Sequence, residues 1–195
     1  MFTGIVEEMA KIEAIEKEKS NTHFTLSCSF VDQLKIDQSV AHDGVCLTVI
    51  ALTDQTYTVT AIEETLGRSN LNGWEVGDAV NLERCIKLSD RLDGHMVQGH
   101  VDQVGTVEDI IDEDGSFKIY ITYEAATFVT VEKGSICVNG VSLTVVDSDD
   151  KRFSVAVIPY TWEHTNLGRL KKNDQVNLEF DILGKYVQKL MEKRT

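Results

Sequence analysis

The chain of 195 residues contains the same sequence pattern twice. Residues 39–49 (SVAHDGVCLTV) align with 135–145 (SICVNGVSLTV), with six identities in eleven positions at an offset of 96. At the same offset, 77–83 and 173–179 share five of seven residues, and at an offset of 95 the opening MFTGIV falls on MVQGHV at 96–101. Blocks in one order at nearly one offset indicate a tandem duplication with its seam near His95. We therefore expect two homologous domains, residues 1–95 and 96–195.

Each half shows the alternation of apolar and polar residues that is typical of β-strands with one buried face. The clearest runs are 24–30 and 57–61 in the first half and 117–123 and 153–157 in the second. Asp-Gly and Asn-Gly pairs, which favour tight turns, punctuate both halves. Several short strands per half, with little helical pattern, predict an all-β fold with a closed or nearly closed antiparallel barrel in each half.

The last residues follow a different period. Apolar side chains recur at helical spacing through the tail, namely Leu183, Tyr186, Val187, Leu190 and Met191. A helix over 183–195 is too short to be stable alone in water, so its apolar face needs a partner surface. The tail has no counterpart at the seam between the repeats, and we interpret it as an oligomerisation element. Packing against its own barrel stays open as an alternative.

Composition narrows the function classes. Lys and Arg number 19 against 32 Asp and Glu, a formal charge of −13, which opposes nucleic-acid binding. No apolar run approaches the roughly 20 residues of a membrane span, and the acidic N-terminus is unlike a signal peptide. The four cysteines form no C-x-x-C pair, and the histidines lack metal-ligand spacing, so we expect no metal. Free thiols without an export signal fit a cytoplasmic location.

Four blocks in order carry a family resemblance: MFTGIV at 1–6, GVCLTV at 44–49, GHMVQGHV at 94–101 and NGVSLTV at 139–145. Together they resemble the riboflavin synthases of the alpha-chain type, over essentially the whole chain. The resemblance implies two six-stranded antiparallel Greek-key barrels in tandem, a short C-terminal α-helix and a homotrimer. It also implies an activity: two molecules of 6,7-dimethyl-8-ribityllumazine yield riboflavin and 5-amino-6-(D-ribitylamino)uracil by transfer of a four-carbon unit.

The duplication and this chemistry agree with each other. A reaction between two copies of one molecule needs two similar pockets, and electrons and carbons pass between the substrates themselves. We therefore expect no cofactor, in keeping with the absence of nucleotide-binding glycine motifs. Lumazine and riboflavin are the expected small-molecule partners, with no nucleic acid and no membrane. Whether the trimer is free or enclosed in a lumazine synthase shell stays open.

Three residues are candidates for catalysis. His100 carries an imidazole, a group that can take a proton from the substrate's 7-methyl group, or else it only hydrogen-bonds the ligand. Cys46 can add to the ring or assist a water, or it is a small buried apolar residue on a strand. Ser39 is a further nucleophile or hydrogen-bond donor, with a turn-stabilising role as the alternative. Repeat mates differ at two of the positions weighed here, because Ser142 matches Cys46 and Ile5 matches His100.

The family's binding segments carry over by resemblance, grouped here by half of the chain. The first half supplies Gly4, Ile5, Val6, Cys46, Leu47, Thr48, Thr60, Ala61, Ile62, Glu63, Glu64 and Thr65. The second supplies Gly99, His100, Val101, Ser142, Leu143, Thr144, Ala156, Val157, Ile158, Pro159, Tyr160 and Thr161. Lys133 matches a position contributed by an adjacent subunit, and Phe2 is expected to line or cover the first pocket unless it is a core residue.

One departure stands out among these residues. Glu64 can accept hydrogen bonds from ribityl hydroxyls, but its repeat mate is Tyr160. This difference puts the equivalent contact of the second half in doubt. A chromophore-binding protein without turnover remains the alternative to an enzyme, and a paired-barrel interaction protein is disfavoured by the negative charge.

Overall fold

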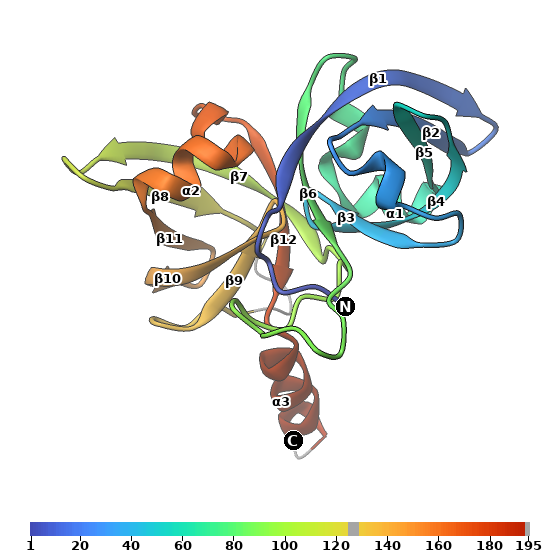
Figure 1. Cartoon of the computed structure of the whole chain (residues 1–195). Helices are drawn as coiled ribbons and strands as arrows, with labels where there is room; N and C mark the ends of the chain where they lie inside the picture. Colours follow the sequence, from blue (N-terminus) through green and yellow to red (C-terminus); the bar gives the residue numbers. More distant parts are fainter. Residues whose placement is uncertain (125–128, 194–195) are drawn as a thin grey trace.

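The chain forms two closed six-stranded barrels and one C-terminal helix, as Figure 1 shows for the computed structural model, which describes residues 1–124 and 129–193. The expected all-β fold with tandem six-stranded antiparallel barrels and a short terminal helix is confirmed. The apolar residues that alternate along each strand point into the barrel that the strand helps to close.

The first barrel is closed in the order β1-β2-β5-β4-β3-β6, with every neighbouring pair antiparallel. Because β5 returns to pair with β2, strands β2 to β5 form a Greek key. The strands are β1 (Glu8–Glu18), β2 (Asn21–Ser27), β3 (Ser39–His42), β4 (Val45–Leu52), β5 (Thr56–Ala61) and β6 (Ala79–Arg84).

The second barrel repeats this topology, with the order β10-β11-β8-β7-β12-β9. Its strands are β7 (Gln103–Asp112), β8 (Phe117–Thr122), β9 (Ser135–Val138), β10 (Val141–Asp149), β11 (Arg152–Val157) and β12 (Gln175–Phe180). Each barrel therefore encloses its own apolar core, centred on residues such as Phe24 and Tyr57 in the first and Ile121 and Phe153 in the second.

Short helices follow equivalent strands in the two repeats. The α-helices are α1 (Glu63–Arg68) and α2 (Pro159–His164), and the 3-10 turns are η1 (Val31–Gln33), η2 (Asn70–Gly73) and η3 (Asn166–Arg169). The sequence pattern did not predict α1 or α2, because six residues are too few to show helical periodicity. Both helices begin within segments expected to bind substrate and extend three residues beyond them.

The C-terminal helix α3 (Ile182–Glu192) projects away from the barrels (Figure 1). Asp181 caps its first turn by accepting a hydrogen bond from the Leu183 N–H. Lys185 ties the helix base to Asp102 through a 2.6 Å ion pair. The five apolar residues of the predicted face are exposed, so the helix does not bury this face against its own barrel. Residues 194 and 195 of the predicted tail lie outside the described residues.

The two barrels meet through equivalent turns. Gly44 and Gly140 both have φ +79, and a Cβ on Gly44 would lie 2.8 Å from the Gly140 N atom. Only glycine permits this close approach of the two backbones. The preceding residues, Asp43 and Asn139, both have φ 45, in the left-handed region that asparagine and aspartate tolerate best.

Asparagine side chains connect the barrels around these turns. The Asn81 Nδ2 donates to the Asn139 carbonyl at 2.9 Å, and its repeat mate Asn177 donates to the Asp43 carbonyl at 3.0 Å. The mates Asn70 and Asn166 add further bonds across the contact. The barrel contact is therefore a set of amide hydrogen bonds that repeats on both sides. The division of the chain into domains at residues 95 and 96 stays a prediction, because residues near that point contact both barrels.

Asp43 breaks the symmetry of this contact. Its repeat mate Asn139 donates a hydrogen bond from Nδ2 to the Asn166 Oδ1. The repeat mate of Asn166 is Asn70, and the Asn70 Oδ1 is buried without a hydrogen-bond partner. Burial raises the pKa of Asp43 from 3.8 to about 8, against the opposing hydrogen bonds from Asn81 and Asn166. The folded protein therefore holds a proton at this site that the unfolded chain releases above about pH 4.

We predict that Asp43→Asn stabilises the protein, because an amide keeps both accepted hydrogen bonds and supplies the donor that Asn70 lacks. The wild-type free energy of unfolding should fall as pH rises from about 4 to about 8, since the folded state binds the extra proton in that range. The variant should lose this slope and gain roughly 1–3 kcal/mol at pH 8. Urea unfolding at several pH values tests this. The reciprocal Asn139→Asp should destabilise, and equal stability of all three proteins would refute the account.

Candidate active site

At one end of each barrel, two neighbouring strands are not paired with each other, which leaves a gap in the ladder. The ladder between β4 and β5 ends at Val49 and Val59, although both strands continue beyond this pair. In the second barrel the ladder between β10 and β11 ends at Val145 and Val155. The predicted binding segments 46–48 and 60–61, and their mates 142–144 and 156–157, are the strand ends that border these gaps. We call them the first and second cleft.

Each cleft is completed by the opening segment of the other repeat. The Ser142 N–H donates to the Gly4 carbonyl at 2.7 Å, so residues 2–6 lie against the second barrel. The Cys46 N–H donates to the Gly99 carbonyl at 2.8 Å, so residues 97–101 lie against the first barrel. Phe2 and Val97 pair with each other where the segments cross. Gly4-Ile5-Val6, from the first half of the chain, therefore lies beside the second cleft, and Gly99-His100-Val101, from the second half, lies beside the first.

The crossing depends on two glycines. Gly4 has φ +77 and Gly99 has φ +80. A Cβ on Gly4 would lie 2.6 Å from the Ser142 Cβ, and one on Gly99 would lie 2.5 Å from the Cys46 Cβ. Real side chains do not approach so closely, so both positions need glycine for conformation and for space.

Two buried carboxylates hold the crossing segments in place. Glu83 accepts hydrogen bonds from the Thr3 and Gly4 N–H groups at 2.6 and 2.9 Å. Glu179, its repeat mate, accepts from Gln98, Gly99 and His100 at 2.7 to 2.9 Å. Burial raises the pKa of both carboxyls, while these bonds act in the opposite direction. The sequence analysis missed these residues, although both close the repeated VNLE block.

Two of the three predicted catalytic residues, Ser39 and Cys46, lie together at the first cleft, and the segment that carries His100 borders it. Ser39 on β3 pairs with Thr48 on β4, and its hydroxyl hydrogen-bonds the Cys46 thiol. His100 directly follows Gly99, whose carbonyl accepts a hydrogen bond from the Cys46 N–H, and the His100 side chain is exposed. A hydroxyl and a thiol thus lie beside the backbone segment that carries His100.

Burial raises the pKa of the Cys46 thiol, and the hydrogen bond from Ser39 only partly offsets this effect. The thiol is therefore protonated at neutral pH in the free chain. Because nucleophilic cysteines need a lowered pKa, this environment favours Cys46 as a neutral hydrogen-bonding group over Cys46 as a thiolate that adds to the ring.

The second cleft has a histidine that the sequence analysis did not select. The His95 Nδ1 lies 2.7 Å from the Ser142 Oγ. Burial lowers the pKa of His95, so the imidazole is neutral at pH 7. The repeated Gly-His dipeptides at 94–95 and 99–100 were the available signal, since both place a histidine beside a crossing segment.

The helices α1 and α2 stand at the outer rim of the clefts. The α1 segment exposes Ile62, Glu63 and Glu64, and the α2 segment exposes Ile158, Pro159 and Tyr160. Thr48 and Thr144 are exposed on the bordering strands, whereas Leu47 is buried and Leu143 half-buried. Thr65 and Thr161 are half-buried near the start of each helix.

Several predicted residues are not free to contact a ligand through their side chains. Phe2 is 0% exposed and packs between the barrels, which matches the core alternative and lets it support Gly99 from behind. Ala61 and Val157 are also fully buried, so only their backbone can take part. The Thr60 hydroxyl is hydrogen-bonded to His23. By contrast, the Lys133 side chain is exposed, and only its backbone N–H is bonded, to the Val145 carbonyl.

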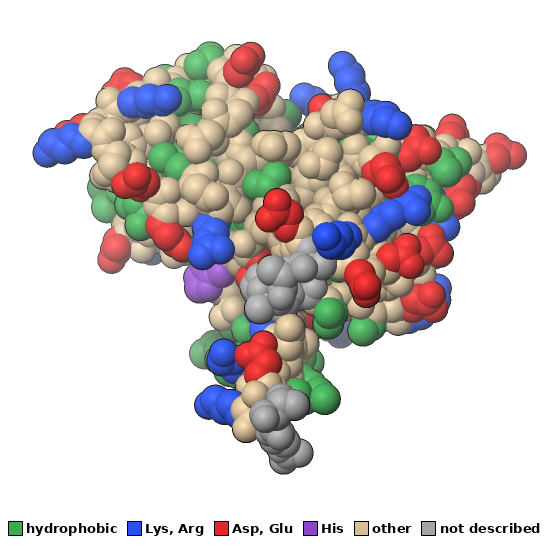
Figure 2. Space-filling model, turned by 180° about the vertical axis from the view of Figure 1, so that it is seen from behind, with side chains coloured by type: hydrophobic (Ala, Val, Ile, Leu, Met, Phe, Trp, Pro, Cys, Tyr) green, Lys and Arg blue, Asp and Glu red, His purple; other side chains and the backbone are tan. Residues whose placement is uncertain are grey.

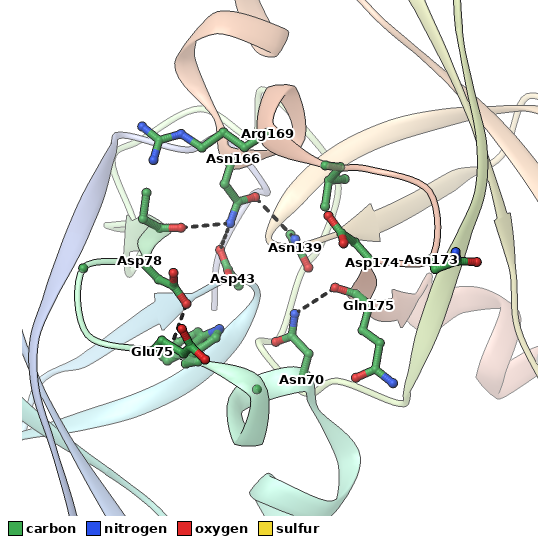
Figure 3. Close-up of a pocket in the computed structure, with 15 residues that line it drawn as sticks. Asp43, Asn70, Glu75, Asp78, Asn139, Asn166, Arg169, Asn173, Asp174 and Gln175 are labelled. Atoms are coloured by element: carbon green, nitrogen blue, oxygen red, sulfur yellow. Dashed lines mark hydrogen bonds between the residues drawn. The ribbon is translucent and has the colours of Figure 1, made fainter.

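A separate groove of about 590 Å³ runs between the barrels on the side of η2 and η3. Figure 3 shows its polar lining, where Asn166 bonds Asp43 and accepts from Asn139 while Asn70 donates to the Gln175 carbonyl. None of the predicted site residues lines it. Most of its amides are engaged in holding the barrels together, so the groove belongs to the barrel contact.

The face of the molecule drawn in Figure 2 carries charged side chains of both signs. Figure 2 shows acidic and basic side chains interspersed over the barrels, with α3 protruding from them. Among residues 1–124 and 129–193, no three His, Cys, Asp or Glu side chains come together as a metal site would require. No helix in that part of the chain is long and apolar enough to span a membrane.

Known proteins share both the sequence and the fold. The lumazine binding domain family matches residues 3–85 and again 98–181. Riboflavin synthase of Actinobacillus pleuropneumoniae is 39% identical over 100% of this chain and 91% of its own length. Riboflavin synthase of Mycobacterium bovis is 41% identical, with 98% of each chain covered.

Solved structures extend the likeness to ligand-bound proteins. LumP in complex with 6,7-dimethyl-8-(1'-D-ribityl) lumazine superposes with a TM-score of 0.84 at 25% identity, covering 92% of this chain and 98% of LumP. LumP with riboflavin gives a TM-score of 0.85 at 24% identity, covering 92% and 99%. With two matched lumazine binding domains and full-length relatives near 40% identity, the chain belongs to the riboflavin synthase family.

Proposed function

We propose that this chain is a riboflavin synthase that converts two molecules of 6,7-dimethyl-8-ribityllumazine into riboflavin and 5-amino-6-(D-ribitylamino)uracil. One lumazine donates a four-carbon unit to the other, so the reaction needs no external oxidant or reductant. The proposal rests above all on one observation: two clefts share the same frame but carry different reactive groups. Identical substrates bound in unlike clefts can take the separate roles of donor and acceptor.

The frame of each cleft suits a flat heterocycle. Separated strand ends leave backbone N–H and C=O groups facing the gap, and a pteridine edge carries matching donors and acceptors. Exposed Thr48 and Thr144 add a hydroxyl at the same place in each cleft. We propose that the segments 46–48, 60–65 and 99–101 bind one lumazine and that 142–144, 156–161 and 4–6 bind the other.

We assign the proton transfer to His100. Its side chain is exposed, and it directly follows Gly99, whose carbonyl is bonded to the Cys46 N–H at the first cleft. An imidazole exchanges protons near neutral pH, which suits removal of a proton from the 7-methyl group of the substrate. Cys46 and Ser39 then act as neutral donors that orient the ring or a water molecule. Holding two substrates in reacting geometry supplies the rest of the rate enhancement.

The chain also needs a partner surface. The apolar face of α3 is exposed over its whole length, and Leu183, Tyr186 and Leu190 are each more than 60% accessible. An apolar stripe of this kind is unstable in water unless another surface covers it. We propose that α3 helices associate in a homotrimer, in which Lys133 of one subunit reaches a neighbouring cleft.

A lumazine synthase shell around the trimer is compatible with the acidic surface. Free cysteines favour a cytoplasmic location.

Purified protein mixed with 6,7-dimethyl-8-ribityllumazine alone tests the activity. We expect one riboflavin for every two lumazines consumed, followed by absorbance, with no addition of metal or cofactor. Riboflavin in any other ratio would contradict the dismutation. A bound, spectrally shifted lumazine without turnover would instead identify a chromophore-binding protein.

Variants of the first cleft test the assigned roles. His100→Ala should lower kcat by roughly 10²–10⁴, the usual effect of losing a positioned acid or base. Cys46→Ser should reduce it only about tenfold, because a hydroxyl replaces one neutral donor with another. Cys28→Ser is the matched control and should keep full activity, because Cys28 follows the end of β2 that pairs with the start of β5, away from the cleft. Wild-type rates for both cleft variants would remove these assignments.

A single charge on the α3 face tests the assembly. Leu190→Glu should convert the oligomer into monomers and reduce activity, because burying an unpaired carboxylate in a helix interface is unfavourable. Lys193→Glu, at the end of the same helix, is the control and should leave the assembly intact. Sedimentation velocity distinguishes the species. A monomeric wild-type protein, or a variant that still sediments as the wild-type oligomer, would contradict the proposed role of α3.

A further inference from the structure

The rims of the two clefts carry different side-chain pairs at equivalent positions. On α1, Glu64 and Arg68 form an ion pair with Nε and Oε1 3.8 Å apart. The repeat offset of 96 places Tyr160 and His164 at the same two positions on α2. There the rings stack, with centroids 4.1 Å apart and planes inclined by 16°. One rim therefore presents a carboxylate and a guanidinium, and the other presents a flat aromatic slab.

Both pairs are placed where a bound ligand would meet them. α1 begins two residues after Ala61 and α2 two residues after Val157, the last residues of the strands that border the clefts. Tyr160 is 67% exposed, and its ring is covered on one side by His164. The His164 Nδ1 lies 2.8 Å from the Tyr160 carbonyl oxygen, which fixes the orientation of the imidazole. The stacked Tyr160 and His164 rings are therefore ordered in the absence of ligand.

The two pairs differ in what they can recognise. A carboxylate accepts charge-assisted hydrogen bonds from hydroxyl groups, and its strength depends on those hydroxyls being present. An aromatic face offers contact area without a directional acceptor, and the Tyr160 hydroxyl supplies only one neutral hydrogen bond. The first rim is therefore suited to a polyol chain, whereas the second rim is indifferent to most of its hydroxyls.

We propose that the stacked Tyr160–His164 pair makes the second cleft tolerant of ligands that lack the ribityl hydroxyls, while the Glu64–Arg68 pair makes the first cleft selective for them. This inference rests on the proposed function, because it takes the lumazine and its ribityl chain as the ligand. It identifies Tyr160 and His164 as specificity-determining residues of the second cleft.

The test compares two ligands in equilibrium titrations followed by lumazine fluorescence. The first is 6,7-dimethyl-8-ribityllumazine, and the second is 6,7,8-trimethyllumazine, in which a methyl group replaces the ribityl chain. In the wild-type protein we expect two classes of site, of which one loses roughly tenfold more affinity than the other when the chain is removed, the effect of one hydrogen bond to a charged acceptor. Two classes with the same dependence on the ribityl chain would overturn the proposal.

Reciprocal exchanges of the pairs assign the two classes to the clefts. Tyr160→Glu with His164→Arg should make the tolerant class as selective as the other. Glu64→Tyr with Arg68→His should make the selective class tolerant. Glu163→Gln, on α2 beside the pair, is the control and should change neither class. All five positions are on the surface, and thermal unfolding verifies that each variant is folded.

The outcomes separate the two hypotheses. If both ligands bind but neither exchange alters the selectivity, the role of the rim pairs is refuted and the proposed function stands. If the unmodified protein binds neither lumazine, the proposed function and this inference both fail. A gain of selectivity in the first exchange together with a loss in the second would establish the inference.

Discussion

The crossing of residues 2–6 and 97–101 is the contact on which both clefts depend. Each segment leaves its own barrel, contacts the other, and is held by a buried carboxylate, Glu83 or Glu179. Gly4 and Gly99 allow the backbone to approach Ser142 and Cys46 closely enough for a direct hydrogen bond. Because every cleft contains chain from both repeats, neither barrel has a complete site alone. The barrel contact is thus part of the proposed active site and more than a linker.

The duplicated frame explains how one chain can treat two identical molecules differently. Strand order and separated ladder ends are the same in both repeats. Side chains at the clefts differ between the repeats, as Cys46 against Ser142, His100 against Ile5, and Glu64 against Tyr160 show. His95 adds a neutral imidazole to the second cleft alone. Symmetry supplies two binding places, and these substitutions give each place its own chemistry.

The fold was predictable because its signals are local and repeated. Alternation at residues 24–28 and 117–122 marks strands whatever their partners, and the offset of 96 shows that both halves share one topology. The exchange of segments was not predictable, since it depends on which barrel Gly4 and Gly99 contact in space. Nor was the raised pKa of Cys46, which arises from burial by residues distant in sequence. The short helices α1 and α2 were missed because six residues show no period.

A crystal structure of the protein with 6,7-dimethyl-8-ribityllumazine tests the exchanged clefts most directly. The account predicts two ligands per chain, one against Cys46–Thr48 and residues 99–101, and the other against Ser142–Thr144 and residues 4–6. Their ribityl chains should extend toward α1 and α2. A ligand held by segments of a single repeat, or one bound in the groove between Asn70 and Asn166, would contradict it.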